Sequence, residues 1–192
     1  MLPKEQEKML AMLSDVSGNC SNVFDMLESV DMTFPTVQDE NGQDVTLTHG
    51  NFGVYRESRD VRVRREAFEK YFGTFRQFIH TFAALYAGSV KTDAYFSRVR
   101  GFKDPCEAAL FASNVPVSVY DSLITAVHNG LGTMKKYLEI RKKALQLEEL
   151  HMYDLYCPIV EDVEIDMPLA EAEKLVKKAT EPLGEVYQQL LD

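Results

Sequence analysis

The chain has 192 residues, 45% hydrophobic and 27% charged, which is ordinary globular composition with room for one large domain or two small ones. Thirty acidic residues against 21 basic ones give a formal charge of -9, so the average surface field repels phosphate backbones and anionic lipid headgroups. We therefore expect neither a nucleic-acid partner nor a membrane partner.

The sequence offers no candidate for a leader or a membrane span. Charged residues within the first ten positions break any signal-peptide core. The longest weakly charged run, Thr81 to Val90, is far shorter than the roughly 20 residues that cross a bilayer. Three widely separated cysteines, Cys20, Cys106 and Cys157, suggest neither disulfides nor a zinc site, so we expect reduced thiols and a cytoplasmic protein.

The N-terminal residues predict two short helices. Apolar residues follow a charged first turn between Pro3 and Leu13, which favours a helix there. The stretch from Ser14 to Asn22 is rich in turn formers and predicts a loop. Within it, Ser21 is the expected cap of the second helix.

Residues 32–48 predict a β-hairpin. β-branched and aromatic residues flank the segment Asp39 to Gly42, where Asn-Gly favours the positive φ angles of a tight turn. Pro35 is expected on an edge. Because a lone hairpin is marginal in water, another element should pack on it.

From Ser58 onward, apolar residues recur every three or four positions, which places one aromatic stripe along a long helix. We expect this stripe to pack in the core rather than to bind a cofactor. An interruption is predicted within 88–92 and a break at 101–105. The stripe consists of Val61, Ala67, Phe68, Tyr71, Phe72, Phe75, Phe78, Ile79, Phe82, Leu85 and Tyr86.

The second half of the chain predicts further helices. A short helix covers 106–112, and a long one follows Pro116 up to about Leu147. The residues after it are expected to be irregular, with a strand favoured by Ile159, Val160, Val163 and Ile165. A last helix should break or kink at Pro182 and continue to the end. These elements predict a mainly α protein, a helical bundle of long amphipathic helices with one small β-hairpin.

The stretch ELHMYDLYCP, residues 149–158, gathers groups from which nucleophilic sites are built. A pair of Cys157 and His151, oriented by Asp154, would need side chains within hydrogen-bond reach, and closeness in sequence is weak support for that. The favoured interpretation is structural. Asp154 would accept backbone or tyrosine hydrogen bonds, while Tyr153 and Tyr156 pack at a helix-to-strand junction.

Two further patterns were weighed as sites. Zinc peptidases place two histidines one helical turn apart with a glutamate after the first, but none of the four histidines here precedes a glutamate or lies near another. The arginine-rich run 56–65 alternates with acidic residues, which favours an exposed, paired helix face over an anion site. The histidines are His49, His80, His128 and His151.

Several unlike motifs occur along the chain in one order. They are SNVFDML, FPTVQDENGQDVTLTHG, ESRDVRVRREAFEKYF, GSVKTDAYFSRVRG, VYDSLI, YLEIRKKALQLEELHMYDLY and PLGEVYQQLL. Together they resemble the oligoendopeptidase F family of zinc oligopeptidases, which is related to thimet oligopeptidase. The resemblance covers about Ser21 to Asp192, and its specificity comes from the shared order.

The resemblance implies a helical zinc metallopeptidase that cuts short peptides in a channel, with a metal-activated water and the glutamate of an H-E-x-x-H motif. No position here matches that motif, so we assign no catalytic, cofactor-binding or metal residue. Residues 1–91, with the hairpin 32–48, resemble the family's N-terminal domain, and 92–192 resemble the start of its catalytic domain. We expect an internal fragment that is inactive alone, binds no zinc and supplies helical walls.

The alternative is a non-catalytic helical module that binds peptides or a protein. A fragment with uncovered apolar surface is also expected to associate with itself.

Overall fold

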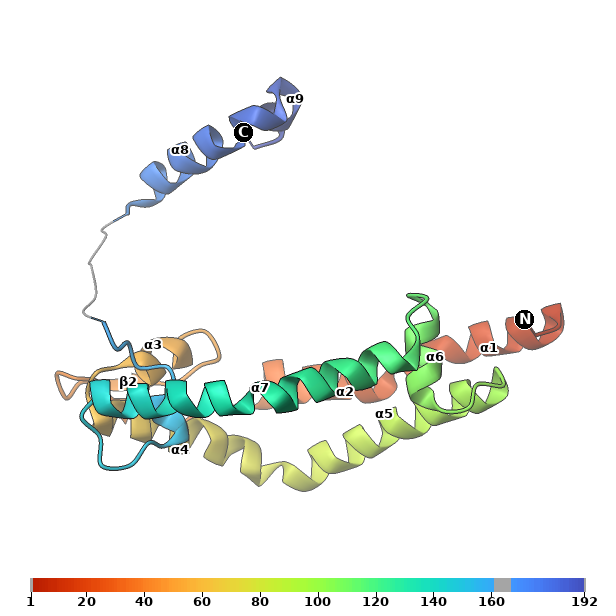
Figure 1. Cartoon of the computed structure of the whole chain (residues 1–192), viewed down its shortest axis with the longest axis horizontal. Coiled ribbons are helices and arrows are strands. Elements are labelled where there is room, and N and C mark those ends of the chain that lie inside the picture. Colours follow the sequence, from red (N-terminus) through yellow and green to blue (C-terminus); the bar gives the residue numbers. More distant parts are fainter. Residues whose placement is uncertain (1, 161–166, 192) are drawn as a thin grey trace. The chain divides into compact units, whose positions relative to one another are not determined.

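The computed structural model describes residues 2–160 and 167–191, and the chain divides into two compact units, Met1–Ile159 and Val160–Asp192 (Figure 1). The described residues form a mainly α protein with one small antiparallel hairpin, as the sequence predicts. No helix among them is long and apolar enough to span a membrane.

The first unit holds most of the elements. Its helices and strands are α1 (Lys4–Ser17), α2 (Asn19–Met26), the π-helical turn η1 (Leu27–Asp31), β1 (Thr36–Gln38), β2 (Asp44–Thr46), α3 (Phe52–Glu57), α4 (Val61–Gln77), α5 (Ile79–Val99), α6 (Pro105–Phe111), α7 (Val117–Ala144) and the 3-10 turn η2 (Met152–Asp154). The second unit holds α8 (Leu169–Thr180), the 3-10 turn η3 (Glu181–Leu183) and α9 (Glu185–Leu190).

The predicted loop between the first two helices is wrong. Helix α1 continues to Ser17, and only Gly18, which keeps a right-handed φ of -76°, separates it from α2. Ser21 therefore lies inside α2 and does not cap it. The turn formers are held in helix because α2 packs along α5, and such packing overrides weak local propensity.

The hairpin forms where it is predicted, with Thr36 opposite Thr46. Its turn differs from the expected one, because only Gly42 takes a positive φ, of 76°. The Asp39 carboxylate accepts the backbone N–H groups of Asn41 and Gln43, each at 2.8 Å, and thereby holds a three-residue loop. These bonds lower the pKa of Asp39, with the backbone bond from Gln43 as the largest cause.

The aromatic stripe belongs to two helices instead of one. The chain leaves helix at Phe78, where ψ is 15°, and α5 then runs without interruption through the predicted break at 88–92. The break at 101–105 is confirmed, since α5 ends at Val99 and Gly101 has a φ of 77°.

The core lies where α3 and α4 cover the hairpin. Six of the eleven stripe residues belong to this core or pack against it, as expected, whereas four stay exposed, namely Val61, Phe72, Ile79 and Tyr86. Lys70 adds a polar tie from α4 to the hairpin by donating to the Thr36 carbonyl at 2.7 Å. The buried cluster consists of Met32, Phe34, Val37, Leu47, Phe52 and Ala67.

The chain after α7 is irregular, as predicted, but the expected strand is not seen in its described part. Ile159 and Val160 form bends, whereas Val163 and Ile165 lie outside the described residues. The predicted break at Pro182 is confirmed, because η3 separates α8 from α9 there. The domain boundary expected at residue 91 falls within α5 and stays a prediction.

Candidate functional site

The segment 149–158 is fixed by a buried ion pair. Arg64 of α4 donates from Nε and Nη2 to Asp154 Oδ1 at 2.8 and 2.6 Å, and the two side chains are 2% and 1% exposed. Asp154 Oδ2 accepts the backbone N–H of His151 at 2.8 Å. Arg64 Nη1 also donates to the Arg59 carbonyl at 2.9 Å, so each charged group has hydrogen-bond partners besides the other.

A second buried arginine holds the same segment from α7. Arg141 donates to the Asp154 carbonyl at 3.1 Å, to the Tyr137 hydroxyl at 3.1 Å and to the Cys157 carbonyl. Because the bonds of both guanidinium groups go to protein acceptors, the cluster ties α4 and α7 to this segment. Its arrangement suits a scaffold rather than anion binding.

The nucleophilic pair weighed for this segment does not assemble. Cys157 is 1% exposed and its thiol contacts only the neighbouring Pro158 carbonyl, at 3.8 Å, among the hydrogen bonds of the described residues. The His151 ring instead stacks on Tyr153, with centroids 4.8 Å apart, and lies 3.6 Å from Asp154. The structural interpretation of Asp154 holds, with Arg64 as a partner that it did not include.

His49 is a structural histidine. Its Nε2 lies 2.9 Å from the Glu28 carbonyl, which can only accept, so Nε2 donates and Nδ1 can accept from the Tyr71 hydroxyl at 2.8 Å. The ring packs edge-on to Phe34 at 4.8 Å. Burial raises the pKa of Tyr71, and the Glu28 carboxylate adds to this. His49 thus joins η1 to the aromatic core.

The imidazoles do not gather around a common point. His80 and His128 are exposed on α5 and α7, and His49 and His151 are engaged as described above. Across residues 2–160 and 167–191, no three His, Cys, Asp or Glu side chains come close enough to hold a metal ion. The donor set of these residues therefore does not fit a zinc site.

The arginine run is exposed and paired only in part. Arg62 matches the expectation, lying 3.4 Å from Asp60 and 3.9 Å from Glu66. Glu66 also binds Lys70 at 2.7 Å, and the hydrogen bond from Lys70 is the largest cause of the lowered pKa of Glu66. Arg64 contradicts the expectation, because it is buried against Asp154.

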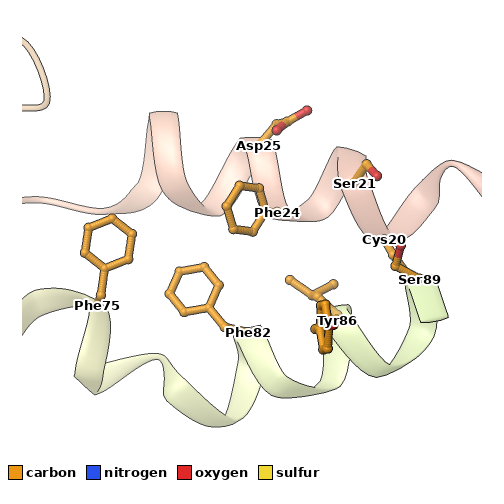
Figure 2. Close-up of a pocket in the computed structure, with 9 residues that line it drawn as sticks. Cys20, Ser21, Phe24, Asp25, Phe75, Phe82, Tyr86 and Ser89 are labelled. Atoms are coloured by element: carbon orange, nitrogen blue, oxygen red, sulfur yellow. The ribbon is translucent and has the colours of Figure 1, made fainter. Parts of the chain in front are cut away.

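An open apolar groove runs between α2 and α5, with a volume of about 430 Å³ (Figure 2). Phe24 of α2 faces Phe82 of α5 with ring centroids 5.5 Å apart, and Phe75 closes one end 5.7 Å from Phe82. Tyr86 stands at the rim and is 74% exposed. Such a groove can receive a large apolar side chain.

The two buried arginines were missed by sequence reasoning, although a signal was present. Arg64 lies three residues before Ala67 and seven before Tyr71, on the apolar stripe of α4. Arg141 likewise follows Leu138 by three positions on the apolar face of α7. A charged residue at a stripe position indicates a buried, paired charge.

Comparison with known proteins extends along the whole chain. The sequence model of the family described as "Peptidase family M3" matches residues 54–192. Oligopeptidase PepF of Bacillus subtilis (strain 168) is 39% identical over 191 residues, which are 100% of this chain and 28% of the relative. Group B oligopeptidase PepB of Streptococcus agalactiae serotype III (strain NEM316) is 37% identical over 98% of this chain and 31% of the relative.

The fold is similar to that of a solved relative. A crystal structure of oligoendopeptidase-F from Enterococcus faecium superposes with a TM-score of 0.82 at 37% identity, covering 99% of this chain and 36% of that one. The chain therefore spans about a third of the length of the relatives it matches. The resemblance to oligoendopeptidase F is confirmed, and since the family match covers well over half of the chain, this protein belongs to peptidase family M3.

Proposed function

We propose that the chain is part of a zinc-dependent oligoendopeptidase that hydrolyses short peptides. The residues described here supply helical scaffold and channel wall, and the catalytic centre is formed by other parts of the enzyme. The observation that carries this proposal is the 39% identity to an oligopeptidase along essentially all of the chain.

We further propose that residues 1–91 belong to an N-terminal helical domain and 92–192 to the start of the catalytic domain. The buried pair of Arg64 and Asp154 would then hold the two domains together, because it joins α4 to the segment after α7. The groove between α2 and α5 would form part of the wall, with room for a large apolar side chain of the peptide.

Zinc in such an enzyme would act as a Lewis acid and activate a water molecule. The described residues do not fit that metal, and we derive no catalytic step for them. The cytoplasm is the compartment that we propose, which is supported by the free thiols of Cys20, Cys106 and Cys157.

An assay of zinc binding and peptide cleavage tests whether the chain lacks the catalytic centre. The purified chain is titrated with zinc by calorimetry and incubated with a quenched-fluorescent peptide, beside full-length B. subtilis PepF as the positive control. We expect neither stoichiometric zinc binding nor turnover from the chain. Stoichiometric zinc together with peptide cleavage would contradict the proposal.

A matched pair of variants tests whether the groove between α2 and α5 binds the peptide. Tyr86 at the groove rim and Phe111 of α6 are both aromatic and are 74% and 70% exposed, so neither substitution should disturb folding. We expect Tyr86→Ala to weaken binding of a short phenylalanine-containing peptide roughly fivefold, since one aromatic contact is lost. Phe111→Ala should leave it unchanged. If the two variants weaken peptide binding equally, the groove between α2 and α5 does not bind the peptide.

A further inference from the structure

A fixed turn presents the His49 ring to the π-helical turn η1. Thr48 donates its backbone N–H to Asn51 Oδ1 at 2.7 Å, and Asn51 donates its own to Thr48 Oγ1 at 3.1 Å. The Asn51 side chain also donates to a carbonyl of β2 at 3.0 Å. Phe34 and Phe75, which carry no charge, lie against the imidazole at centroid distances of 4.8 and 6.2 Å. The turn and these rings therefore fix where the imidazole lies when its charge changes.

The Nδ1 atom of His49 lies near two different oxygen atoms. The Tyr71 hydroxyl of α4 is 2.8 Å away, and Oε1 of Glu28 in η1 is 3.4 Å away. Nε2 lies 2.9 Å from the Glu28 carbonyl and donates to it in both charge states of the ring. In the neutral ring Nδ1 has a lone pair and accepts the proton of the Tyr71 hydroxyl. In the protonated ring Nδ1 carries a hydrogen, so Tyr71 loses this acceptor and Nδ1 donates toward the Glu28 carboxylate.

The groups around the imidazole suit this exchange of partners. Oε2 of Glu28 accepts the Ser29 hydroxyl at 2.8 Å, so Oε1 is the oxygen available to the ring. From α4, burial and the Glu28 carboxylate raise the pKa of Tyr71, so its hydroxyl keeps its proton at neutral pH. The charge of Arg56 on α3 opposes that rise in the pKa of Tyr71. A proton on His49 therefore replaces a contact between a carboxylate and a lone pair by an ion pair.

The Glu28 side of this contact is continuous with one wall of the groove between α2 and α5. Helix α2 passes directly into η1, since Met26 keeps helical φ and ψ of -64° and -45°. Phe24 and Asp25, four and three residues before Glu28, line the groove (Figure 2). A π-helical turn departs from α-helical hydrogen bonding, and such turns are frequent at functional sites. A contact that anchors Glu28 therefore also limits movement of the α2 wall.

We propose that His49 is a pH-sensitive contact that fixes η1, and with it the α2 wall of the groove, to the aromatic core when its ring is protonated. Histidine is the side chain that ordinarily changes charge between about pH 5 and 8. Because the ion pair with Glu28 needs the charged ring, the added restraint is present on the acid side of that range and is lost as the pH rises. The contacts lie within the first unit, and the inference does not depend on the proposed peptidase function.

Nuclear magnetic resonance of the full chain with isotope-labelled histidine tests the proton sites. In the neutral ring of His49 we expect the proton on Nε2, and acidification should add the second proton at Nδ1. Glu28→Gln removes the charge but keeps the length of the side chain. It should lower the midpoint of the His49 titration by about half a pH unit, as expected for a partly exposed ion pair.

Asp25→Asn is the matched control, because it removes an exposed carboxylate of α2 that makes no ion pair with His49 among the described residues. It should shift the midpoint by less than about 0.2 pH unit, since solvent screens charges that are not in contact. A neutral ring with its proton on Nδ1, or equal shifts in Glu28→Gln and Asp25→Asn, would overturn the inference.

Hydrogen exchange of the η1 amides tests the restraint without any substitution. After correction for the intrinsic effect of pH on exchange, protection in Leu27–Asp31 is compared with protection in α4. We expect this ratio to be roughly twofold to fivefold greater at about pH 5.5 than at about pH 8. The difference should disappear in Glu28→Gln. A ratio that does not change with pH in the parent chain would show that His49 does not control η1.

Discussion

Arg64 and Asp154 form an ion pair in which neither side chain is more than 2% exposed. Removing one partner of such a pair leaves a buried charge without compensation. We expect Asp154→Asn to lower the free energy of unfolding by about 3–5 kcal/mol, measured by urea denaturation with circular dichroism.

Glu149 supplies the matched control for this prediction. It belongs to the same segment and lies 3.7 Å from His151, but its side chain is 82% exposed. Glu149→Gln should change the unfolding free energy by less than about 0.5 kcal/mol. Similar losses in the two variants would mean that the pair with Arg64 does not stabilise the fold.

Because of Tyr71, the free energy of unfolding depends on pH in the alkaline range. Burial raises its folded-state pKa above the ordinary value of 10.0, so the unfolded chain loses the phenolic proton first. The stabilisation that Tyr71 contributes is complete below its pKa in the unfolded chain. It is lost as the pH rises through its pKa in the folded chain. We expect Tyr71→Phe to flatten the fall in unfolding free energy between about pH 9 and 11. Tyr86→Phe, with an exposed ring, should keep the slope of the parent chain.

At the residue scale, the sequence predicted that Asp154 accepts backbone hydrogen bonds but not which side chain it pairs with. The absence of adjacent histidines was sufficient to set aside a zinc motif. The partner of Asp154, however, lies 90 positions earlier in the chain, and no local pattern specifies a contact at that distance.

At the scale of elements, the crossing of α2 and α5 depends on one glycine. A Cβ built on Gly88 would lie 2.5 Å from Cys20 Sγ. We expect Gly88→Ala to destabilise the chain by about 1–3 kcal/mol in thermal or urea unfolding, because the two helices must separate or the thiol must turn away.

The double variant makes this explanation testable. In a Cys20→Ala background the sulfur is gone, and only ordinary contact remains at 3.8 Å from Cys20 Cβ. Gly88→Ala should then be neutral or stabilising by up to about 1 kcal/mol, as its helix propensity predicts. A loss of the same size in both backgrounds would exclude the contact with Cys20 as the cause.

The same glycine explains one failed prediction. Gly88 was interpreted as a helix interruption, because glycine lowers helix propensity, whereas α5 runs through it and uses the space for α2. The actual break, at Phe78, carries no sequence signal, since a phenylalanine continues the apolar period. The hairpin was predicted well because Gly42 supplies the positive φ locally. Elements set by local chemistry could be predicted, and those set by packing could not.

At the scale of the whole molecule, family membership was easier to predict than architecture. Motifs of unlike composition in a fixed order identify relatives even where each motif is weak, and the match over residues 54–192 agrees with that interpretation. Which helix faces are covered depends on contacts between distant segments.

The two compact units differ in what can hold them folded. Every buried apolar residue of the described chain, from Leu10 to Cys157, lies in the first unit, and none of residues 167–191 is buried. We expect a chain ending at Ile159 to unfold cooperatively with a Tm within about 2–3 °C of the parent, because it keeps every buried apolar residue of the described chain. A peptide of residues 160–192 should be mostly unfolded, since isolated helices of this length are marginal in water. Circular dichroism of both pieces checks this, and a stably helical peptide, or a first unit without a cooperative transition, would contradict it.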